Sequence, residues 1–281
     1  MVEKRSWLDY LAHFFLLFGI GLMLFPVYVA FIASTHTMPE LMTAPMPLLP
    51  GDKFIDNYWQ VLTGHNLAIG APVWQMMANS LVMALGITFG KITISLLAAF
   101  AIVYFRFAFR MLFFWLIFIT LMLPVEVRIL PTYQVVASMG LLDSHVGLIL
   151  PLIASATATF LFRQFFMTVP NEICEAARMD GAGPIRFFFD ILIPMSKTSI
   201  AALFVILFIY GWNQYLWPLL VTTQEDYYTI LIGINRMLAV SDEVPQWPIV
   251  MATTLLAMIP PVIVVVLMQR QFVRGLIDAE K

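Results

Sequence analysis

The chain has 281 residues, of which 61% are hydrophobic and 11% are charged, and its net charge is −2. Ordinary soluble domains carry about 25% charged residues, so a soluble core could not hide this much apolar surface, and we expect most of the chain to lie in lipid. The near-neutral charge argues against nucleic acid as a partner. With a single cysteine, Cys174, the chain can form neither an intrachain disulfide nor a cysteine-based metal site.

Six apolar runs are long enough to cross a membrane, which takes about 20 mainly apolar residues. Lys4 and Arg5 precede the first run, as they would in a signal peptide, but this run is longer than the roughly 7–15 apolar residues of such a peptide, and we interpret it as a retained span. The predicted fold class is an all-α membrane protein with six transmembrane helices. The predicted helices cover residues 12–33, 79–104, 111–129, 146–166, 200–221 and 249–268.

The distribution of Lys and Arg sets the expected orientation, because cytoplasmic segments carry an excess of these residues. With the N-terminus inside, three of them lie in outer segments (Lys53, Arg128 and Arg236) and Lys91 falls within a span. The opposite orientation would invert the bias, so both termini are predicted to be cytoplasmic. The eleven residues on the inner side are Lys4, Arg5, Arg106, Arg110, Arg163, Arg178, Arg186, Lys197, Arg270, Arg274 and Lys281.

Two of the predicted outer segments are longer than a minimal connection. Residues 35–75 are rich in proline and contain Tyr58, Trp59 and Trp74, and residues 222–247 carry four acidic side chains. Either segment could contact a soluble partner outside the membrane. The alternative for residues 35–75 is a solvated connector with aromatic anchors at the membrane interface.

A glycine pair in the second predicted helix is similar to part of a phosphate loop but does not match its pattern. Gly86 and Gly90 are separated by three residues and Lys91 precedes Ile92, whereas a phosphate loop needs four residues between its glycines and Ser or Thr directly after Lys. The glycines fit a small-xxx-small packing face better. Lys91, a charge inside a span, is a candidate for the translocation path, with a structural pairing or a snorkelling side chain as the alternatives.

Two further groups of polar residues are candidates for a path or gate. Glu126 and Arg128 lie between two prolines near the outer end of the third helix, where a broken helix could form an outer gate or hold a local ion pair. Asn213 and Gln214 lie along the fifth helix, where they could line the path or bond neighbouring helices. The chain offers few cations besides Lys91 and Arg128, so a partner chain is an alternative source of contacts to an anionic cargo.

The longest predicted inner segment, residues 163–198, is typical of two short helices joined by a glycine bend. Pro170 suits the start of the first helix, and Gly181 suits the position after its end, where a left-handed conformation costs glycine nothing. The second helix is expected over residues 184–193 and to end at Pro194. Both helices are expected to lie against the inner face of the membrane.

The first of these helices combines a small apolar stripe with flanking charges. Ile173, Ala176 and Ala177 form the stripe, where small side chains would let a partner surface approach closely. The alternative is a surface helix that only packs on the bundle. The flanking charges are Glu172, Glu175, Arg178 and Asp180.

The same segment resembles the EAA loop of ABC importer permeases, through Glu175-Ala176-Ala177, Gly181 and Ile191-x-x-Pro194. The resemblance implies a type I ABC importer permease bundle over residues 77–268, after an N-terminal part (1–76) that holds the first helix and a periplasmic loop, and before a cytoplasmic tail (269–281). It also implies that residues 163–198 couple the chain to an ATPase subunit. The coupling residues it implies are Glu175, Ala176, Ala177, Asp180 and Gly181.

Partners follow from the same resemblance. It implies a homologous permease that forms a heterodimer with this chain, two ATPase subunits that bind ATP and Mg, and a periplasmic solute-binding protein. The chain itself is expected to hold no cofactor and no metal and to be no enzyme. Its four histidines form no helical i, i+4 pair, and no Gly-x-Ser-x-Gly elbow occurs.

Four stretches narrow the resemblance to a subfamily. Residues 121–128, 158–167, 209–218 and 269–276 resemble, within the maltose-type carbohydrate permeases, the second permease subunits of sn-glycerol-3-phosphate importers. This implies sn-glycerol-3-phosphate as cargo, with related glycerophosphodiesters as further cargo, in the bacterial inner membrane. Maltose or another sugar, carried by the same class of importer, remains the alternative cargo. An ion-coupled secondary transporter is less favoured, because it would place acidic residues inside the spans, and every Asp and Glu lies at or outside a span end.

Overall fold

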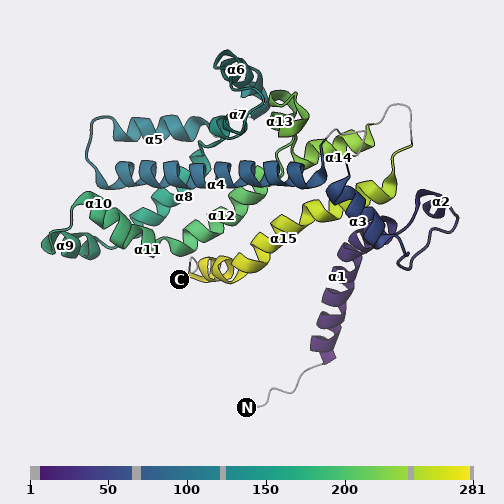
Figure 1. Cartoon of the computed structure of the whole chain (residues 1–281). Coiled ribbons are helices and arrows are strands. Elements are labelled where there is room, and N and C mark those ends of the chain that lie inside the picture. The colour runs from purple at the N-terminus through teal and green to yellow at the C-terminus, as the bar shows by residue number, and fades with distance from the viewer. Residues whose placement is uncertain (1–6, 65–70, 121–124, 240–243, 279–281) are drawn as a thin grey trace. The chain divides into compact units, whose positions relative to one another are not determined.

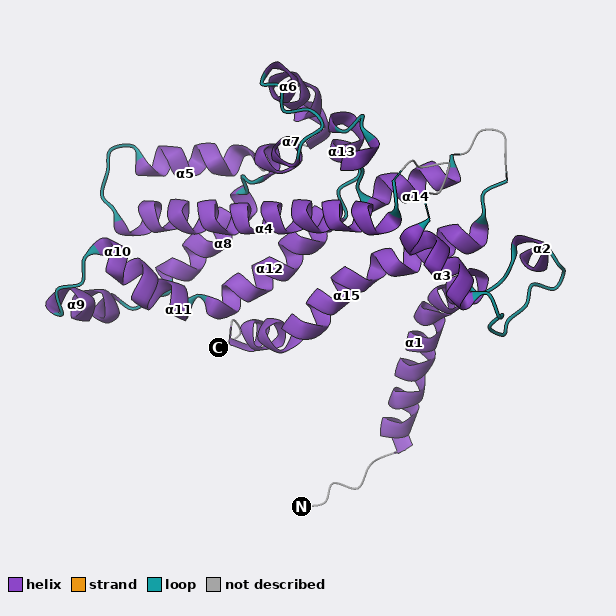
Figure 2. Cartoon of the chain, viewed as in Figure 1, coloured by secondary structure: helices purple, strands orange, loops and turns teal. Residues whose placement is uncertain are grey.

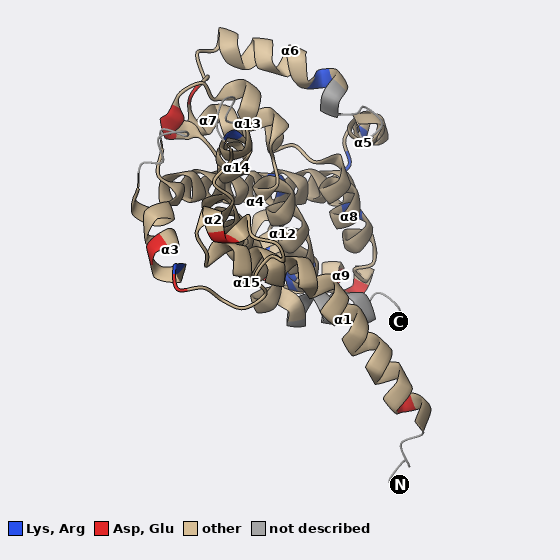
Figure 3. Cartoon of the chain, turned by 90° about the vertical axis from the view of Figure 1, so that its right-hand side faces the viewer, with Lys and Arg blue, Asp and Glu red and all other residues tan. Residues whose placement is uncertain are grey.

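The computed structural model describes residues 7–64, 71–120, 125–239 and 244–278, and every regular element within those ranges is helical (Figures 1 and 2). The chain divides into two compact units, Met1–Gln75 with Gly233–Ile259, and Met76–Ile232 with Pro260–Lys281. Figure 3 shows long stretches of helix that carry no charged residue, as a chain with 11% charged residues requires.

The first unit begins with α1 (Trp7–Ser34), a 28-residue apolar helix. Its side chains are buried only at its last residues, Ile32, Ala33 and Ser34. Apolar groups along the rest of the helix remain exposed within the chain, as expected of a helix whose surroundings are lipid. The unit also contains α2 (Met38–Leu41), α3 (Phe54–Thr63), most of α14 (Ile230–Leu238) and the first part of α15 (Trp247–Asp278).

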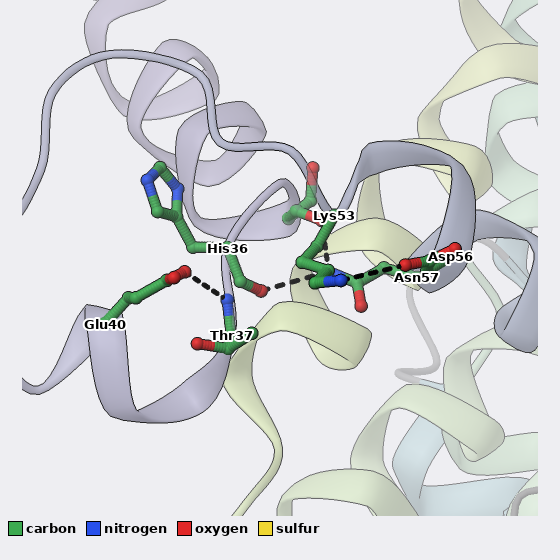
Figure 4. A network of polar contacts seen from close by, with 7 residues as sticks. His36, Thr37, Glu40, Lys53, Asp56 and Asn57 are labelled. Atoms are coloured by element: carbon green, nitrogen blue, oxygen red, sulfur yellow. Dashed lines mark hydrogen bonds and ion pairs between the residues drawn. The ribbon is translucent and has the colours of Figure 1, made fainter.

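The described part of the segment after α1 is folded rather than extended (Figure 4). Asn57 on α3 donates from its side-chain amide to the carbonyls of Ser34 and His36, at 2.8 and 3.0 Å. The carboxylate of Glu40 on α2 accepts from the backbone N–H of Thr37 at 2.9 Å. The two Asn57 bonds hold α3 against the end of α1 and give this segment a defined shape.

The second unit is organised around α4 (Val73–Tyr104). Its other elements in chain order are α5 (Arg110–Ile119), α6 (Val125–Ser138), α7 (His145–Ile149), η2 (Leu150–Leu152), α8 (Ala156–Met167), α9 (Asn171–Met179), α10 (Pro184–Phe187), the π-helix η3 (Phe188–Leu192), α11 (Ile193–Met195), α12 (Lys197–Trp212), α13 (Leu216–Val221), η4 (Glu225–Tyr227), the start of α14 and the second part of α15. The loop from α4 to α5 and helices α9 and α10 lie at the same end of α4 (Figure 1).

Three of the described helices are long and apolar enough to cross a membrane, namely α1, α4 and the Trp247–Gln269 part of α15. Two bent pairs can each count as one further span: His145–Leu152 with Ala156–Met167, bent by 50°, and Pro184–Met195 with Lys197–Trp212, bent by 73°. The run 111–129, expected as one helix, includes the shorter α5 and the start of α6, and residues 121–124 lie outside the described residues.

Two expected helices are interrupted in the structure. The run 146–166 breaks after Leu152, and α8 starts afresh at Ala156 with Ser155 as its N-cap, whose hydroxyl accepts from the N–H of Ala158. The run 200–221 breaks after Trp212 and resumes at Leu216. The hydropathy of the sequence did not reveal either break, because each predicted run is apolar on both sides of its break.

Pro194 does not end the helix before it, contrary to the expectation from the sequence. The helical path continues through α11 to Ser196, directly after the π-helix η3. Proline lacks an N–H and its ring clashes with the carbonyl four residues earlier in an α-helix. The wider π turn removes the need for that i to i−4 bond, and so it accommodates the proline within the helix.

Glycines on α4 and α12 allow close helix packing, as the small-xxx-small pattern predicted. A Cβ on Gly86 would lie 2.6 Å from the Ile149 side chain, and one on Gly90 would lie 2.5 Å from Ile153. On α12, a Cβ on Gly211 would lie 2.9 Å from the Cα of Ala84. Real Cβ atoms do not come this close to other atoms, so a larger residue would force a neighbour to shift: the Ile149 or Ile153 side chain at Gly86 or Gly90, and the α4 backbone at Gly211.

Polar bonds fasten the start of the second unit's α4 to the loop that follows α13. The amide of Asn79 donates to the carbonyls of Asp226 and Tyr228, and its oxygen lies 3.1 Å from the imidazole of His145. The hydroxyl of Ser80 accepts from the backbone N–H of Ile230 at 2.8 Å. Both α4 side chains are buried, so their bonds replace the water that they lose.

Replacing Gly86 by alanine tests the packing. Gly86→Ala should destabilise the protein by about 1–3 kcal/mol through overpacking against Ile149, measured by thermal denaturation in detergent. Gly21→Ala on α1, where a Cβ meets nothing within 4 Å, should not destabilise it.

A double-mutant cycle identifies the contact partner. In an Ile149→Ala background the clashing atoms are absent, so Gly86→Ala should carry no further cost. An equal cost in both backgrounds would show that Ile149 is not the obstacle.

Candidate functional site

The predicted coupling residues lie on and after α9, which packs on the second unit with one face. Ile173, Cys174 and Ala177 contact an apolar cluster built from α4, α8, α10, η3 and α12. The predicted stripe is divided in the structure: Ala177 is buried in the cluster and Ile173 is half-buried against it, whereas Ala176 is exposed. Adjacent helical residues point about 100° apart, so the two alanines face different sides.

The outward face of this region carries Glu175, Ala176 and Met179, with the side chain of Met179 89% exposed. Beyond the bend, Ile185 and Phe189 are also exposed, at 75% and 59%. This end of the unit therefore presents apolar side chains interspersed with charges, a composition that suits contact with a protein surface.

The bend after α9 is a glycine cap, which confirms the prediction for Gly181. Gly181 has φ of +72°. Its N–H donates to the carbonyl of Arg178, and the N–H of Ala182 donates to that of Ala177, at 3.0 and 2.9 Å. This is the bonding pattern of a Schellman motif. At the other end Pro170 is the N-cap residue, immediately before the first turn.

Two buried phenylalanines after the bend anchor it to α4. The Phe187 ring lies 5.3 Å from the ring of Tyr104, and the Phe188 ring lies 4.8 Å from that of Phe100. Both contacts fall at the end of α4, as Figure 1 shows for α10. A displacement of α9 and α10 would therefore act directly on α4.

A second candidate site is a cavity of about 490 Å3 in the same unit, where Lys91 and Arg128 both line the wall. Lys91 is 7% exposed, and its ammonium lies 3.7 Å from the centroid of the Tyr210 ring. The wall also includes the N-cap Ser155 and the first-turn residue Thr157 of α8.

The other predicted path or gate residues, Asn213, Gln214 and Glu126, are not found on the described wall of this cavity. Asn213 and Gln214 occupy the break between α12 and α13 and are not among the described residues that line the cavity. The Gln214 amide donates to the carbonyl of Tyr210 at 3.1 Å, a bond within its own segment. The side chain of Glu126 lies outside the described residues, so its predicted pairing with Arg128 stays a prediction.

Residues that sequence reasoning missed complete the cavity. Tyr210 and the start of α8 were not singled out, although Ser155 before a helix is a known N-cap signal. The signal is hidden because Ser155 falls inside a run that is apolar enough for one continuous span.

Comparison with known proteins now identifies the family. Residues 91–278 match the model of the binding-protein-dependent transport system inner membrane component. The chain belongs to this family. The match begins at Lys91 and includes the α9 segment, so both candidate sites lie within the family's shared region.

Relatives of this permease are similar over their full length. The sn-glycerol-3-phosphate transport system permease protein UgpE of Escherichia coli O1:K1 / APEC is 58% identical over 281 residues, 100% of both chains. The protein of the same name from Shigella dysenteriae serotype 1 is 57% identical over the same full length. The permease subunit is thus an inner-membrane transport component rather than an enzyme, as predicted.

A solved structure shares the fold. A chain from the crystal structure of a bacterial ABC transporter involved in the import of the acidic polysaccharide alginate superposes with a TM-score of 0.81 at 22% identity, covering 96% of this permease and 100% of that chain. The predicted ABC importer permease fold is therefore confirmed at the level of an all-helical bundle.

Two glycines at the α9–α10 bend make a matched pair of mutations. Gly181→Ala should cost about 1–3 kcal/mol locally, because its φ of +72° is strained for a side chain, and should reduce transport by the assembled importer. Gly183→Ala should leave transport unchanged, since Gly183 has φ of −69°.

At both positions a Cβ meets nothing within 4 Å, so the pair isolates backbone conformation. Transport rates normalised to membrane protein amount provide the measurement. Equal rates for the two variants would show that the Gly181 cap is dispensable.

Proposed function

We propose that this permease is a transmembrane subunit of an ATP-driven ABC importer that carries sn-glycerol-3-phosphate, and related glycerophosphodiesters, across the inner membrane. The identity of 58% over the whole length of a relative named for that transport system carries the proposal. The two cations on the cavity wall support an anionic cargo. Import of maltose or another sugar by the same machinery is the competing function.

The proposal includes six spans with both termini in the cytoplasm. α1, α4 and α15 would each cross once, α5 with α6 would form a span together, and each of the two bent pairs would form another. Residues 1–76 would then form the tail, first span and periplasmic loop, residues 77–268 the shared transport domain, and residues 269–281 a cytoplasmic tail. The excess of Lys and Arg on the inner side supports this orientation.

The proposed assembly contains a homologous permease, two ATPase subunits that bind ATP and Mg, and a periplasmic binding protein. The outward face of α9 suits the ATPase contact, because Glu175, Ala176 and Met179 are all exposed. The folded outer segment with α2 and α3 offers a surface of defined shape to a soluble partner.

In the proposed mechanism, closure of the ATPases on ATP moves α9. The contacts of Phe187 with Tyr104 and of Phe188 with Phe100 transmit the movement to α4. Since α4 also carries Lys91 on the cavity wall, the same displacement would change the cavity's access from the inner to the outer side while the binding protein releases its ligand.

Charge reversal at Glu175 tests the coupling surface. Glu175→Lys should abolish uptake while leaving the permease in the membrane. The Glu175 carboxylate is exposed in this chain and would become buried against the ATPase, so a lysine there would bury a positive charge that is unpaired or faces another positive charge, at a cost of about 2–5 kcal/mol. The measurement is ATPase copurification together with uptake.

The same reversal one turn earlier, Glu172→Lys, is the control and should have a much smaller effect, since the resemblance assigns no coupling role to Glu172. Normal uptake by Glu175→Lys would contradict the coupling role.

Cargo is tested by uptake of labelled sn-glycerol-3-phosphate and labelled maltose in cells with and without this permease, the other subunits being present. Deletion should abolish only sn-glycerol-3-phosphate uptake. Loss of maltose uptake alone would retain the importer and overturn its cargo.

A further inference from the structure

The buried ammonium of Lys91 has no hydrogen bond or ion pair with any described residue. The ammonium instead makes a cation–π contact with Tyr210, 3.7 Å from the centroid of its ring. Intramembrane charges are costly and ordinarily pair with another group or face a cavity. Lys91 is 7% exposed and lines the cavity of about 490 Å3, so a buried cationic residue borders a space that a ligand can fill.

Arg128 on α6 contributes a second fixed positive charge to the same wall. No carboxylate is found among the described residues that line this cavity. The two cations therefore add to each other's field, and each would be stabilised by an anion between them.

The N-terminus of α8 contributes donors as well. The carbonyl of Ser155 accepts the first helical bond from Thr159 and the Ser155 hydroxyl accepts from Ala158, which leaves the N–H groups of Ala156 and Thr157 without helical partners. Both residues line the cavity. The N-terminal end of a helix carries a partial positive charge of about half a unit, and such ends bind phosphate groups.

The packing of α8 on α4 sets this arrangement. Ser95 lies one turn after Lys91 on the same face of α4, and its hydroxyl donates to the carbonyl of Ser155 at 3.2 Å. Gly90 gives Ile153 room to approach α4. These two contacts hold the first turn of α8 beside Lys91.

We propose that Lys91, Arg128 and the first turn of α8 form a binding subsite for the phosphate group of the cargo within this subunit. The inference rests on the proposed cargo and assigns to this chain the recognition of the anionic end. Tyr210 positions the Lys91 ammonium, and the glycerol end of the cargo would contact the remainder of the translocation path.

Transport kinetics give the first test. Lys91→Gln should raise the KM for labelled sn-glycerol-3-phosphate at least about tenfold, the effect of losing one charge-assisted hydrogen bond, whereas Lys91→Arg should retain most of the affinity. Arg106→Gln, which removes an exposed cation from the loop between α4 and α5, is the control and should leave KM unchanged. An unchanged KM for Lys91→Gln at normal membrane levels would overturn the subsite.

A reporter cysteine gives a second test that does not depend on the cargo. The reporter is Thr157→Cys in a Cys174→Ser background, which removes the only native thiol of this chain. In the assembled importer, the reporter is modified with one of two methanethiosulfonate reagents, the negatively charged sulfonatoethyl or the positively charged trimethylammonioethyl compound. The anionic reagent should react faster, after correction for intrinsic reactivity, and Lys91→Gln should reduce that preference severalfold. Equal corrected rates would overturn the subsite.

Protection of the same reporter identifies the source of the phosphate. sn-Glycerol-3-phosphate should slow its modification, and glycerol at the same concentration should not. Protection by phosphatidylglycerol alone would assign the cavity to a lipid headgroup and overturn the proposal. A wild-type importer that transports no sn-glycerol-3-phosphate but keeps the anionic preference would refute the proposed cargo while supporting an anion site.

Discussion

The close approach of α4 to the break between η2 and α8 is the contact on which the rest of the second unit depends. A broken helix at membrane depth exposes backbone polar groups, which are tolerated only where protein or a cavity satisfies them. Here Gly90 brings Ile153 against α4, and Ser95 donates to the carbonyl of Ser155. The break is thereby stabilised, and the start of α8 is available to line a cavity.

Helix α4 links three regions that differ in chemistry. At its start, Asn79 and Ser80 bind the backbone of the segment after α13 through buried polar bonds. In its middle it carries Lys91, which forms no ion pair with a described residue, and at its end it packs on aromatic residues next to the α9 surface. Because polar bonds and aromatic packing fasten both ends, the helix can act as a rigid connection between the α9 surface, for which we propose the coupling role, and the cavity.

Among the described Lys, Arg, Asp and Glu residues, Lys91 is the one that is buried, with 7% of its surface exposed. The ion pair of Arg186 with Asp190 is largely exposed, and such pairs contribute little to stability. A buried cation without a carboxylate partner costs free energy, so its retention in a membrane helix indicates a function. The cavity and the helix terminus beside it supply the physical setting for that function.

The sequence by itself determined the class of the molecule, the apolar runs, the charge bias and the glycine cap after α9, because hydropathy, Lys/Arg placement and the Gly181 position are local properties. Membership in the permease family was also readable from Glu175-Ala176-Ala177 and its surroundings. The tertiary structure alone decided which alanine faces outward, where apolar runs break and which polar residues meet. Lys91, Arg128 and Thr157 are far apart in sequence and share one cavity wall only because the packing of α4, α6 and α8 brings them together. Gly90 contributes by letting Ile153, just before α8, approach α4.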